Sequence, residues 1–295
     1  LTEKGFVTLL WDPSFRIPRE YPLSVPTIDP ASSVFVRFDS AGRTLAIGRR
    51  SPSGYLVYLG DPTNLGPEPG LISDSRIAWH ATKIGALAWV AVRDDGKLEL
   101  RTGSVNPLTG DLMDETLITT LEAPTRVVRW DSAGFILDDG REIHSLDPAG
   151  RTLWSREGSM PSVTPSLVVA AVPDEASDTT RWEVIDRASG DPVELDVAGS
   201  PDNATIVTSR ELDIVAAISG NDTRSTLTVG GPDLVAKRIV QVDADVTPIG
   251  FTTGNTYMIF EANGTNDLIF VNWRTGATQS LDIPDIYEVL ALDLS

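Results

Sequence analysis

The 295-residue sequence has no cysteine, two histidines and only four lysines. The absence of cysteine excludes disulfide bonds, thiol nucleophiles and thiolate metal sites. His80 and His144 supply all of the imidazole, so a metal centre or a Ser-His-Asp triad has few residues to draw on. The longest apolar runs, residues 84–92 and 167–172, are of strand length, so no segment is expected to span a membrane. No glycine-rich phosphate loop is recognisable, and nucleotide binding is not supported.

Basic residues are also scarce. Lys and Arg total 24 against 42 Asp and Glu, which gives a formal net charge of −18. Nucleic acids and anionic membranes attract basic surfaces, so neither is an expected partner. Asp outnumbers Glu by 28 to 14, and Arg outnumbers Lys by 20 to 4. A GC-rich genome and adaptation to high salt both remain possible origins of this bias.

Three Asn-x-Thr triplets begin at Asn203, Asn221 and Asn263, and each is a possible glycosylation site. The sequence begins with Leu rather than Met, so we expect an upstream signal or anchor to have been removed. Together with the missing cysteine, these features favour an exported protein. The expected location is extracellular or in the cell envelope, anchored by a segment outside this chain.

An internal repeat sets the expected architecture. Residues 36–42 (VRFDSAG) recur as residues 128–134 (VRWDSAG), with six of seven positions identical and an offset of 92. This offset corresponds to two units of about 46 residues, the size of one four-stranded propeller blade. No segment shows the 3.6-residue period of a helix with caps, which predicts an all-β fold.

A strand–turn–strand element recurs seven times, at intervals of about 44 residues. Its turns contain Asp-Pro, Gly-Pro, Ser-Gly or Thr-Gly, because Pro presets φ and Gly accepts a positive φ. The copies are at residues 10–13, 59–62, 101–103, 146–150, 185–190, 229–232 and 272–276. A short alternating apolar run precedes each copy, as expected for strands packed between two layers.

These motifs resemble the broad WD40-like, TolB-like and quinoprotein-like β-propeller superfamily. Residues 38–46 (FDSAGRTLA) look like the TolB-type strand–turn–strand, and residues 145–154 (SLDPAGRTLW) look like the quinoprotein-type outer hairpin. The Trp-Asp pairs at residues 11–12 and 130–131 lack the Gly-His pairs of WD40 repeats, and the vicinal cysteines of quinoprotein enzymes are absent. The resemblance therefore implies a scaffold rather than an activity.

The spacing predicts one propeller domain with seven blades of mostly four antiparallel strands. Residues 32–283 would form six full blades, residues 1–31 the outer strands of a closing blade, and residues 284–295 its inner strand. Pairing of the termini would leave no open sheet edge. Six blades with a terminal extension are the alternative.

The loops that join the second and third strands of the blades, called here the acidic loops, are expected to share one face. The candidate binding residues in them are Asp94, Asp95, Asp138, Asp139, Asp174 and Asp222. They would suit cations or a basic partner. The alternative is that Asp-Gly and Asn-Gly are simply good hairpin turns. Calcium is a possible ligand of the paired acids, but none of the pairs has the pattern of a Ca²⁺ loop; no other cofactor is expected.

An interaction domain is expected rather than an enzyme, although the enzyme question stays open. The partner would be a protein or a glycan bound through loop faces, and the oligomeric state is not predicted. The runner-up is a carbohydrate-active hydrolase with acids at the channel mouth, where Asp39, Asp131 and Glu211 lie near inner-strand ends. A structural shell or filament subunit is a third class. The seven tryptophans are interpreted as packing between blades.

Overall fold

The computed structural model describes residues 7–10, 19–22, 34–66, 68–174, 179–195, 197–221, 223–232, 237–252, 255–263, 265 and 267–282. Its architecture is built from β-strands, which confirms the all-β prediction. In the same ranges no helix has the length and apolarity needed to cross a membrane.

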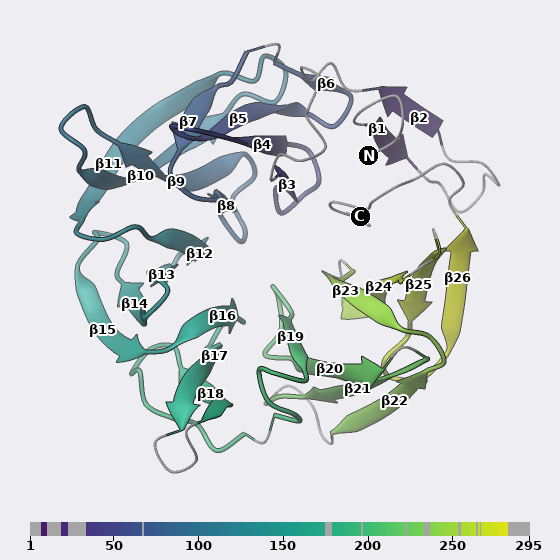
Figure 1. Cartoon of the computed structure of the whole chain (residues 1–295). Coiled ribbons are helices and arrows are strands. Elements are labelled where there is room, and N and C mark those ends of the chain that lie inside the picture. The colour runs from purple at the N-terminus through teal and green to yellow at the C-terminus, as the bar shows by residue number, and fades with distance from the viewer. Residues whose placement is uncertain are drawn as a thin grey trace. The chain divides into compact units, whose positions relative to one another are not determined.

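The chain divides into two compact units, and the division falls within the third blade. The first unit comprises Leu1–Ala133, Pro148–Gly150 and Asp285–Asp293. The second comprises Gly134–Asp147, Arg151–Pro284 and Leu294–Ser295. Each unit is a series of antiparallel sheets in which strands that are consecutive in the sequence pair with one another (Figure 1).

The first unit contains a two-stranded sheet, the first two blades and one further strand. Its strands are β1 (Val7–Leu10), β2 (Arg19–Pro22), β3 (Val34–Phe38), β4 (Leu45–Ser51), β5 (Gly54–Asp61), β6 (Asn64–Leu65), β7 (Leu71–Ser73), β8 (Ala78–Trp79), β9 (Ala86–Val92), β10 (Leu98–Val105), β11 (Leu112–Leu121) and β12 (Arg126–Asp131). Blade 1 is the sheet β3–β4–β5, to which both β6 and β7 pair through β5, and blade 2 is β8–β9–β10–β11.

The second unit contains the remaining strands. They are β13 (Gly134–Asp138), β14 (Glu142–Leu146), β15 (Thr152–Glu157), β16 (Ser159–Val163), β17 (Leu167–Asp174), β18 (Thr179–Asp186), β19 (Thr205–Thr208), β20 (Val215–Asn221), β21 (Arg224–Gly230), β22 (Arg238–Val242), β23 (Val246–Phe251), β24 (Met258–Ala262), β25 (Asp267–Val271) and β26 (Thr278–Asp282). Blade 3 is β12–β13–β14–β15, blade 4 is β16–β17–β18, blade 5 is β19–β20–β21–β22 and blade 6 is β23–β24–β25–β26.

The described residues form six blades, so the prediction of seven is corrected to the alternative of six. The two N-terminal strands expected in a seventh blade pair with each other, with Val7 opposite Pro22 and Leu10 opposite Arg19, but among the described residues their sheet has no further strand. The expected inner strand at residues 284–295 lies outside the described residues. Within them, blade 4 has three strands rather than four. The proposed domain boundaries stay a prediction.

Turn chemistry explains the repeated DSAG sequence. Gly42 and Gly134, which end the two copies, have φ values of 64° and 118°. A Cβ at Gly134 would lie 2.0 Å from the carbonyl oxygen of Leu146, so no side chain fits there. Both copies therefore place glycine where φ is positive, although β4 begins three residues after Gly42 and β13 begins at Gly134 itself.

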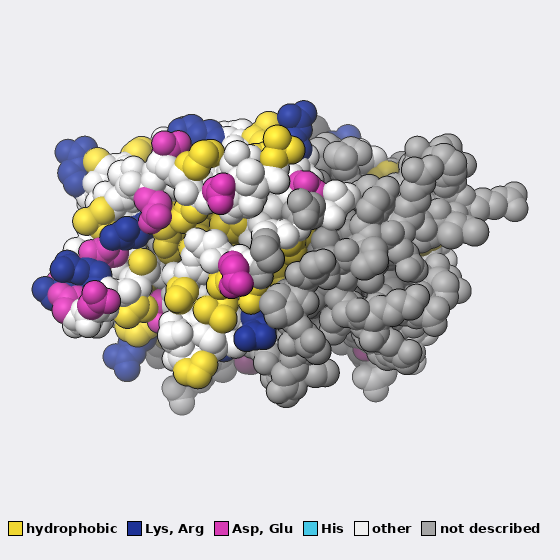
Figure 2. Space-filling model, turned by 90° about the horizontal axis from the view of Figure 1, so that it is seen from above, with side chains coloured by type: hydrophobic (Ala, Val, Ile, Leu, Met, Phe, Trp, Pro, Cys, Tyr) yellow, Lys and Arg dark blue, Asp and Glu magenta, His cyan; other side chains and the backbone are white. Residues whose placement is uncertain are grey.

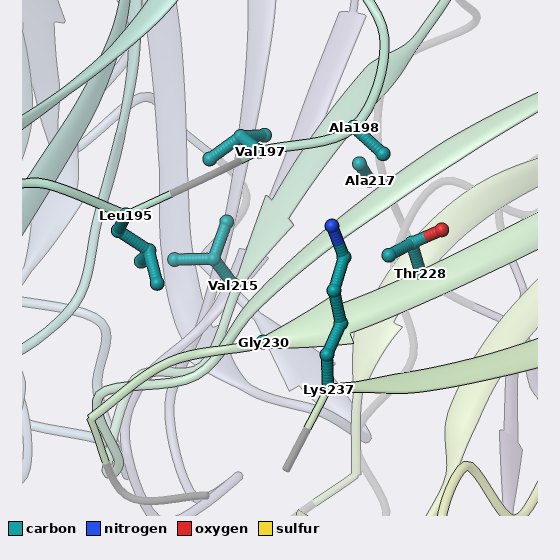
Figure 3. A pocket seen from close by; sticks show the side chains of 8 residues that line it. All are labelled: Leu195, Val197, Ala198, Val215, Ala217, Thr228, Gly230 and Lys237. Atoms are coloured by element: carbon teal, nitrogen blue, oxygen red, sulfur yellow. The ribbon is translucent and has the colours of Figure 1, made fainter.

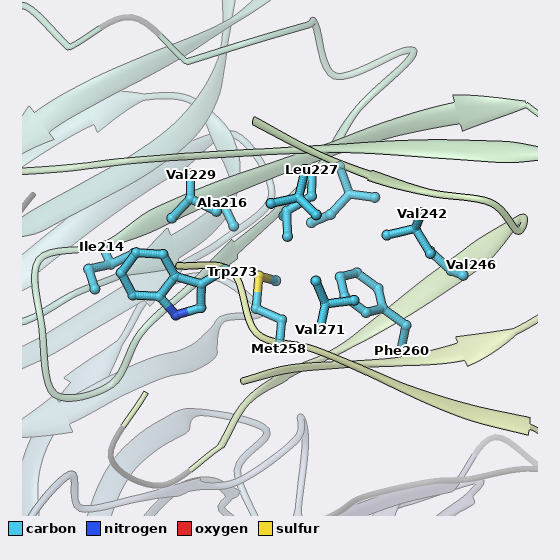
Figure 4. Packing of buried hydrophobic residues seen from close by; sticks show 12 residues of the cluster. Ile214, Ala216, Leu227, Val229, Val242, Val246, Met258, Phe260, Val271 and Trp273 are labelled. Atoms are coloured by element: carbon cyan, nitrogen blue, oxygen red, sulfur yellow. The ribbon is translucent and has the colours of Figure 1, made fainter. Parts of the chain in front are cut away.

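The hydrophobic core lies between successive blades. Figure 4 shows the cluster formed by blades 5 and 6, in which Leu227 and Val229 face Met258, Phe260 and Val271. All five of these side chains are inaccessible to solvent. Central strands buried on both faces read as continuous apolar runs, which is why residues 167–172 form a strand.

Three tryptophans support this packing with a hydrogen bond to a distant backbone carbonyl. The indole N–H of Trp79 in blade 2 donates to Arg37 of blade 1 over 3.0 Å. Trp154 in blade 3 donates to the carbonyl of Arg187, which follows β18, over 2.8 Å. Trp273 donates to Asn255 over 2.8 Å. For Trp79 and Trp154, the interpretation as residues that pack between blades is confirmed.

Candidate functional site

The structure places the predicted acidic residues in the expected type of loop. Asp94 and Asp95 lie between β9 and β10 of the first unit, and both are exposed. Asp138 and Asp139 lie at the β13–β14 turn and Asp174 ends β17, all in the second unit. Asp222 lies outside the described residues.

The local contacts show how the acidic loops use their carboxylates. Asp95 Oδ1 accepts the amide of Lys97 at 3.2 Å, and buried Asp138 accepts the amide of Gly140 at 2.8 Å. Asp139 Oδ1 accepts the amides of Arg141 and Glu142 at 2.8 and 2.7 Å. These carboxylates therefore fix their own turns, as short acidic side chains commonly do.

Asp139 also ends a chain of polar side chains that runs from the β13–β14 turn across β14 to β15. His144 Nε2 lies 3.2 Å from Asp139 Oδ2, and His144 Nδ1 lies 2.8 Å from Ser155 Oγ. Burial raises the pKa of Asp139, but the hydrogen bonds from Glu142, Arg141 and His144 outweigh it and hold that pKa below its ordinary value. The carboxyl is therefore ionised at neutral pH and orients the imidazole.

This Ser-His-Asp chain has the connectivity of a hydrolytic triad, which the sequence did not reveal because Ser155 reaches His144 only through the pairing of β14 with β15. Its ring nitrogens are used in the reverse of the usual order, with the carboxylate on Nε2 and the hydroxyl on Nδ1. Ser155 is exposed on the outer strand β15 rather than set in a concave pocket. We therefore assign the chain a role in holding the β13–β14 turn.

The three acids expected near a channel mouth are engaged in structural contacts. Asp39 is 2% exposed, and its carboxylate accepts the amides of Arg43 at 2.8 Å and Gly85 at 3.0 Å. Asp131 Oδ2 lies 2.6 Å from Arg129 Nε. Glu211 accepts the side-chain amide of Asn255 at 2.9 Å. Glycoside hydrolysis needs a carboxylic acid that reaches the sugar, whereas Asp39 is turned into the protein.

A buried polar residue lies at the end of the innermost strand, or directly after it, in each of the six described blades. The six residues are Asp39, His80, Asp131, Thr164, Ser209 and Thr252. Each accepts a backbone amide of the turn that follows it. From the sequence, Asp39 and Asp131 can be matched through the repeat, and His80 can be interpreted as a hydrogen-bonded structural residue of an inner strand. The sequence does not link the six positions, because the hydrogen bond is kept while the residue type changes.

The same turns connect neighbouring blades. Asp213 of blade 5 accepts hydrogen bonds from the hydroxyls of Thr164 and Ser166 of blade 4, at 2.5 and 2.6 Å. Ser209 of blade 5 donates to Asn255 of blade 6 over 2.6 Å. These hydrogen bonds link blade 4 to blade 5 and blade 5 to blade 6, so the buried polar groups stabilise the packing of neighbouring blades. We call the contacts of Asp213 the clamp between blades 4 and 5.

His80 is the titratable member of this set. Its Nδ1 accepts the amides of Thr82 and Lys83 at 3.2 and 3.0 Å, and this requires an unprotonated Nδ1. Its ring packs edge-on against Trp130, with 4.6 Å between the ring centroids. Burial, followed by the charge of Lys83, lowers the pKa of His80 below 6.5. The side chain is therefore neutral at neutral pH.

The possible glycosylation sites lie at or near strand ends in the second unit. Asn203 precedes β19, Asn221 ends β20 and Asn263 follows β24. Asn203 and Asn263 are exposed, and the side chain of Asn221 is not among those described. The amide of Asn263 donates to Asp245 over 3.0 Å.

A shallow hollow of about 220 Å³, a volume that includes open solvent, lies on blade 5 beside the segment that follows blade 4. Leu195, Val197 and Val215 line one part of it, and Lys237 extends from its edge (Figure 3). Because this volume includes open solvent, the enclosed space is far smaller than the pockets of about 300–1,000 Å³ that hold small-molecule ligands.

The surface carries charges of both signs. In the view of Figure 2, Lys and Arg side chains alternate with Asp and Glu among apolar and neutral ones. The net charge of −18 is thus not gathered into one acidic patch on the described part of this face. Among the described residues, no group of three or more His, Asp or Glu is arranged to hold a metal ion.

No protein-family model and no curated protein matches this sequence. Similar solved structures include the WD40 domain of coronin from Toxoplasma gondii, with a TM-score of 0.56 and 13% identity over 84% of this chain and 69% of that one. Oligogalacturonate lyase from Vibrio parahaemolyticus has a TM-score of 0.56 and 12% identity over 94% of this chain and 84% of the lyase. The β-propeller domain of Cps50 (Swd1) from Myceliophteria thermophila has a TM-score of 0.52 and 15% identity over 88% and 89% of the two chains. At such identities the likeness establishes the fold, and the expected resemblance to β-propellers is confirmed at that level.

Proposed function

We propose that this β-propeller is a non-catalytic interaction domain that binds a protein or glycan partner through its acidic loops. The observation that carries the proposal is the contrast between two sets of acids. Asp39 and its equivalents at inner-strand ends are buried and bonded to turn amides, whereas Asp94 and Asp95 are exposed. A loop already fixed by its own hydrogen bonds loses little conformational entropy on binding.

Replacing Asp by Asn tests the role of charge without opening the turns, because an Asn side-chain oxygen still accepts the amide bond. The variants are D94N/D95N and D139N, each titrated with a fluorescent oligolysine peptide and with an array of neutral and acidic glycans. A matched control is D243N, since Asp243 is 81% exposed but lies outside these loops. Loss of binding in the loop variants alone supports the proposal. Equal loss in D243N, or no binding by the wild type, overturns it.

The non-catalytic part of the proposal has its own test at Ser155. A fluorophosphonate probe reacts with activated serines, and we expect no labelling of the wild-type protein. Labelling that disappears in S155A would show that the Asp139–His144–Ser155 chain activates the hydroxyl, and would make the domain a hydrolase.

Export to the cell surface or envelope belongs to the same proposal. It is supported by the three Asn-x-Thr triplets and by the exposure of Asn203 and Asn263. Mass spectrometry of the protein from its native source measures glycan occupancy directly. Glycans at these positions would partly shield the loop ends of the second unit and confine the binding surface to the remaining loops.

A further inference from the structure

Among the described residues, little covers the outer edge of β18 in blade 4. In blades 2, 3, 5 and 6, the third strand pairs with a fourth. In blade 4, the only pairing at that edge within the described residues is the isolated bridge between Ile185 and Pro192. Blade 4 therefore exposes the edge of its third strand, whereas each complete blade covers the third strand with a fourth.

A fourth strand begins to pair with β18 at Pro192 and Val193 but does not continue. The amide of Val193 donates to the carbonyl of Val184 over 2.8 Å, which is a regular ladder bond. The amide of Leu195 then donates to the carbonyl of Val193, so the chain turns away from the sheet. Outward-pointing backbone groups recur every second residue, so those of Trp182 and Thr180 follow Val184 along the same edge.

One flank of this edge is cationic. Glu183 is 8% exposed and lies between two guanidiniums, 2.8 Å from Arg156 Nη2 and 2.9 Å from Arg181 Nη2. The three side chains therefore carry one net positive charge in a chain whose net charge is −18. Arg181 is 54% exposed, so this charge is within reach of an incoming strand.

The opposite flank is apolar. Trp182, which points to the other side of the strand from Arg181, packs in a cluster with Leu195 and Val197. Leu195 and Val197 also line the hollow on blade 5 (Figure 3). A strand added to this edge would thus present alternate residues to guanidiniums and to apolar side chains.

The chain itself indicates which sequence fits. Residues 193–197 read VELDV, with apolar and acidic residues in alternation, and Val193 already occupies the first position of the missing strand. Continued along β18, this pattern would place acids on the side of Arg181 and apolar residues on the side of Trp182.

We propose that the edge of β18 binds, by strand addition, an extended segment of a partner protein in which apolar and acidic residues alternate. Main-chain hydrogen bonds to Thr180 and Trp182 would supply affinity, and the two unlike flanks would set the register. The edge begins beside the acidic loop of Asp174, which pairs with Thr179, but the proposal uses the backbone of Thr180 and Trp182 and not the carboxylates of the acidic loops.

The probe is a nine-residue peptide in which Val and Glu alternate, with acetylated and amidated ends. Its controls are a peptide of the same composition with the acids grouped at one end, and a peptide with Lys in place of Glu. We expect fluorescence anisotropy to detect only the alternating peptide. N-methylation of one alternate set of its amides should abolish binding, and N-methylation of the other set should leave it unchanged.

Two pairs of protein variants locate the site. Thr180→Pro removes an outward N–H and should abolish binding, whereas Thr180→Val retains it. Arg181→Glu should weaken binding by about tenfold or more, because charge-assisted contacts are lost. Arg224→Glu is the matched control, since Arg224 is 61% exposed and also paired to one carboxylate.

Amide hydrogen exchange at Thr180 and Trp182 distinguishes a partner strand from two other occupants of this edge, the chain itself and a second copy of it. The proposal expects rapid exchange in the free protein and protection on peptide binding. Protection without peptide at low protein concentration would mean that the chain covers its own edge. Protection that rises with protein concentration would identify a second copy. Either of these two results overturns the proposal. It is also overturned if the grouped peptide binds as well as the alternating one, or if Arg224→Glu weakens binding as much as Arg181→Glu.

Discussion

Blades 4 and 5 begin alike and end differently. Thr164 and Ser209 occupy the same position after the inner strand, and both are fully buried and hydrogen-bonded to their turns. In blade 5 the outer strand β22 then pairs with β21 over five residues, whereas blade 4 forms a single bridge at Pro192. The inner part of a blade is therefore specified more strictly than its outer part.

The physical reason lies in what each outer segment meets. In β22, Val240 and Val242 turn inward and the residues between and before them face solvent. Pro192 lacks an N–H, and the apolar residues after it are drawn into the core between blades 4 and 5. Two segments with similar alternation thus adopt different structures because one of them is recruited by a neighbouring core.

The largest expected effect on stability comes from creating a cavity in the core of the complete blade 5. Leu227 is fully buried in blade 5, so Leu227→Ala should lower the free energy of unfolding by about 2–5 kcal/mol. Leu195 beside blade 4 is only partly buried, and Leu195→Ala should cost about 1 kcal/mol. Urea unfolding measures both. Equal losses would mean that the irregular segment is packed as strictly as a strand.

The next effect concerns the clamp between the two blades. Asp213→Ala removes the acceptor for Thr164 and for both the hydroxyl and the amide of Ser166. We expect a loss of about 3 kcal/mol, because hydrogen bonds to a charged group are among the stronger ones. Asp243→Ala, at an exposed ion pair, should change stability by less than about 0.5 kcal/mol. A small effect at Asp213 would show that the clamp is dispensable.

A smaller effect is expected from acid. In blade 2, His80 occupies the position directly after the innermost strand, as Thr164 does in blade 4. Its folded-state pKa lies below 6.5, so the unfolded chain takes up the proton more readily. The stability due to neutral His80 is complete above pH 6.5 and is lost as the pH falls through the folded-state pKa. His80→Thr should flatten this part of the stability profile, whatever its cost at pH 7; an unchanged slope would exclude His80 as the cause.

The smallest expected effect is that of calcium. The oxygens of Asp95 and Asp139 are already used by turn amides, so millimolar CaCl₂ should raise the melting temperature no more than NaCl of equal ionic strength. Thermal melts with and without chelator check this. A rise specific to calcium and reversed by chelator would indicate a bound ion, and would revive the acidic loops as a metal site.

Much of the fold was predictable because its signals are local. The blade spacing follows from the repeat that ends in Gly134, where a positive φ and a close carbonyl require glycine. The acidic loops were placed at the correct strand junctions for the same reason. The site was less predictable, since whether an acid is exposed like Asp94 or buried like Asp138 depends on neighbours from other strands.

The sequence alone determined the all-β class, the blade period and the turns, since strand alternation and turn geometry depend on residues a few positions apart. Only the tertiary structure decided the incomplete edge of blade 4, the bond from Gly85 to Asp39 and the bond from Arg156 to Glu183. These last two pairs are 46 and 27 residues apart, and their partners are chosen by how the blades pack. No local pattern encodes that choice, because a charged or polar residue can satisfy its hydrogen bonds within its own turn or across to the next blade.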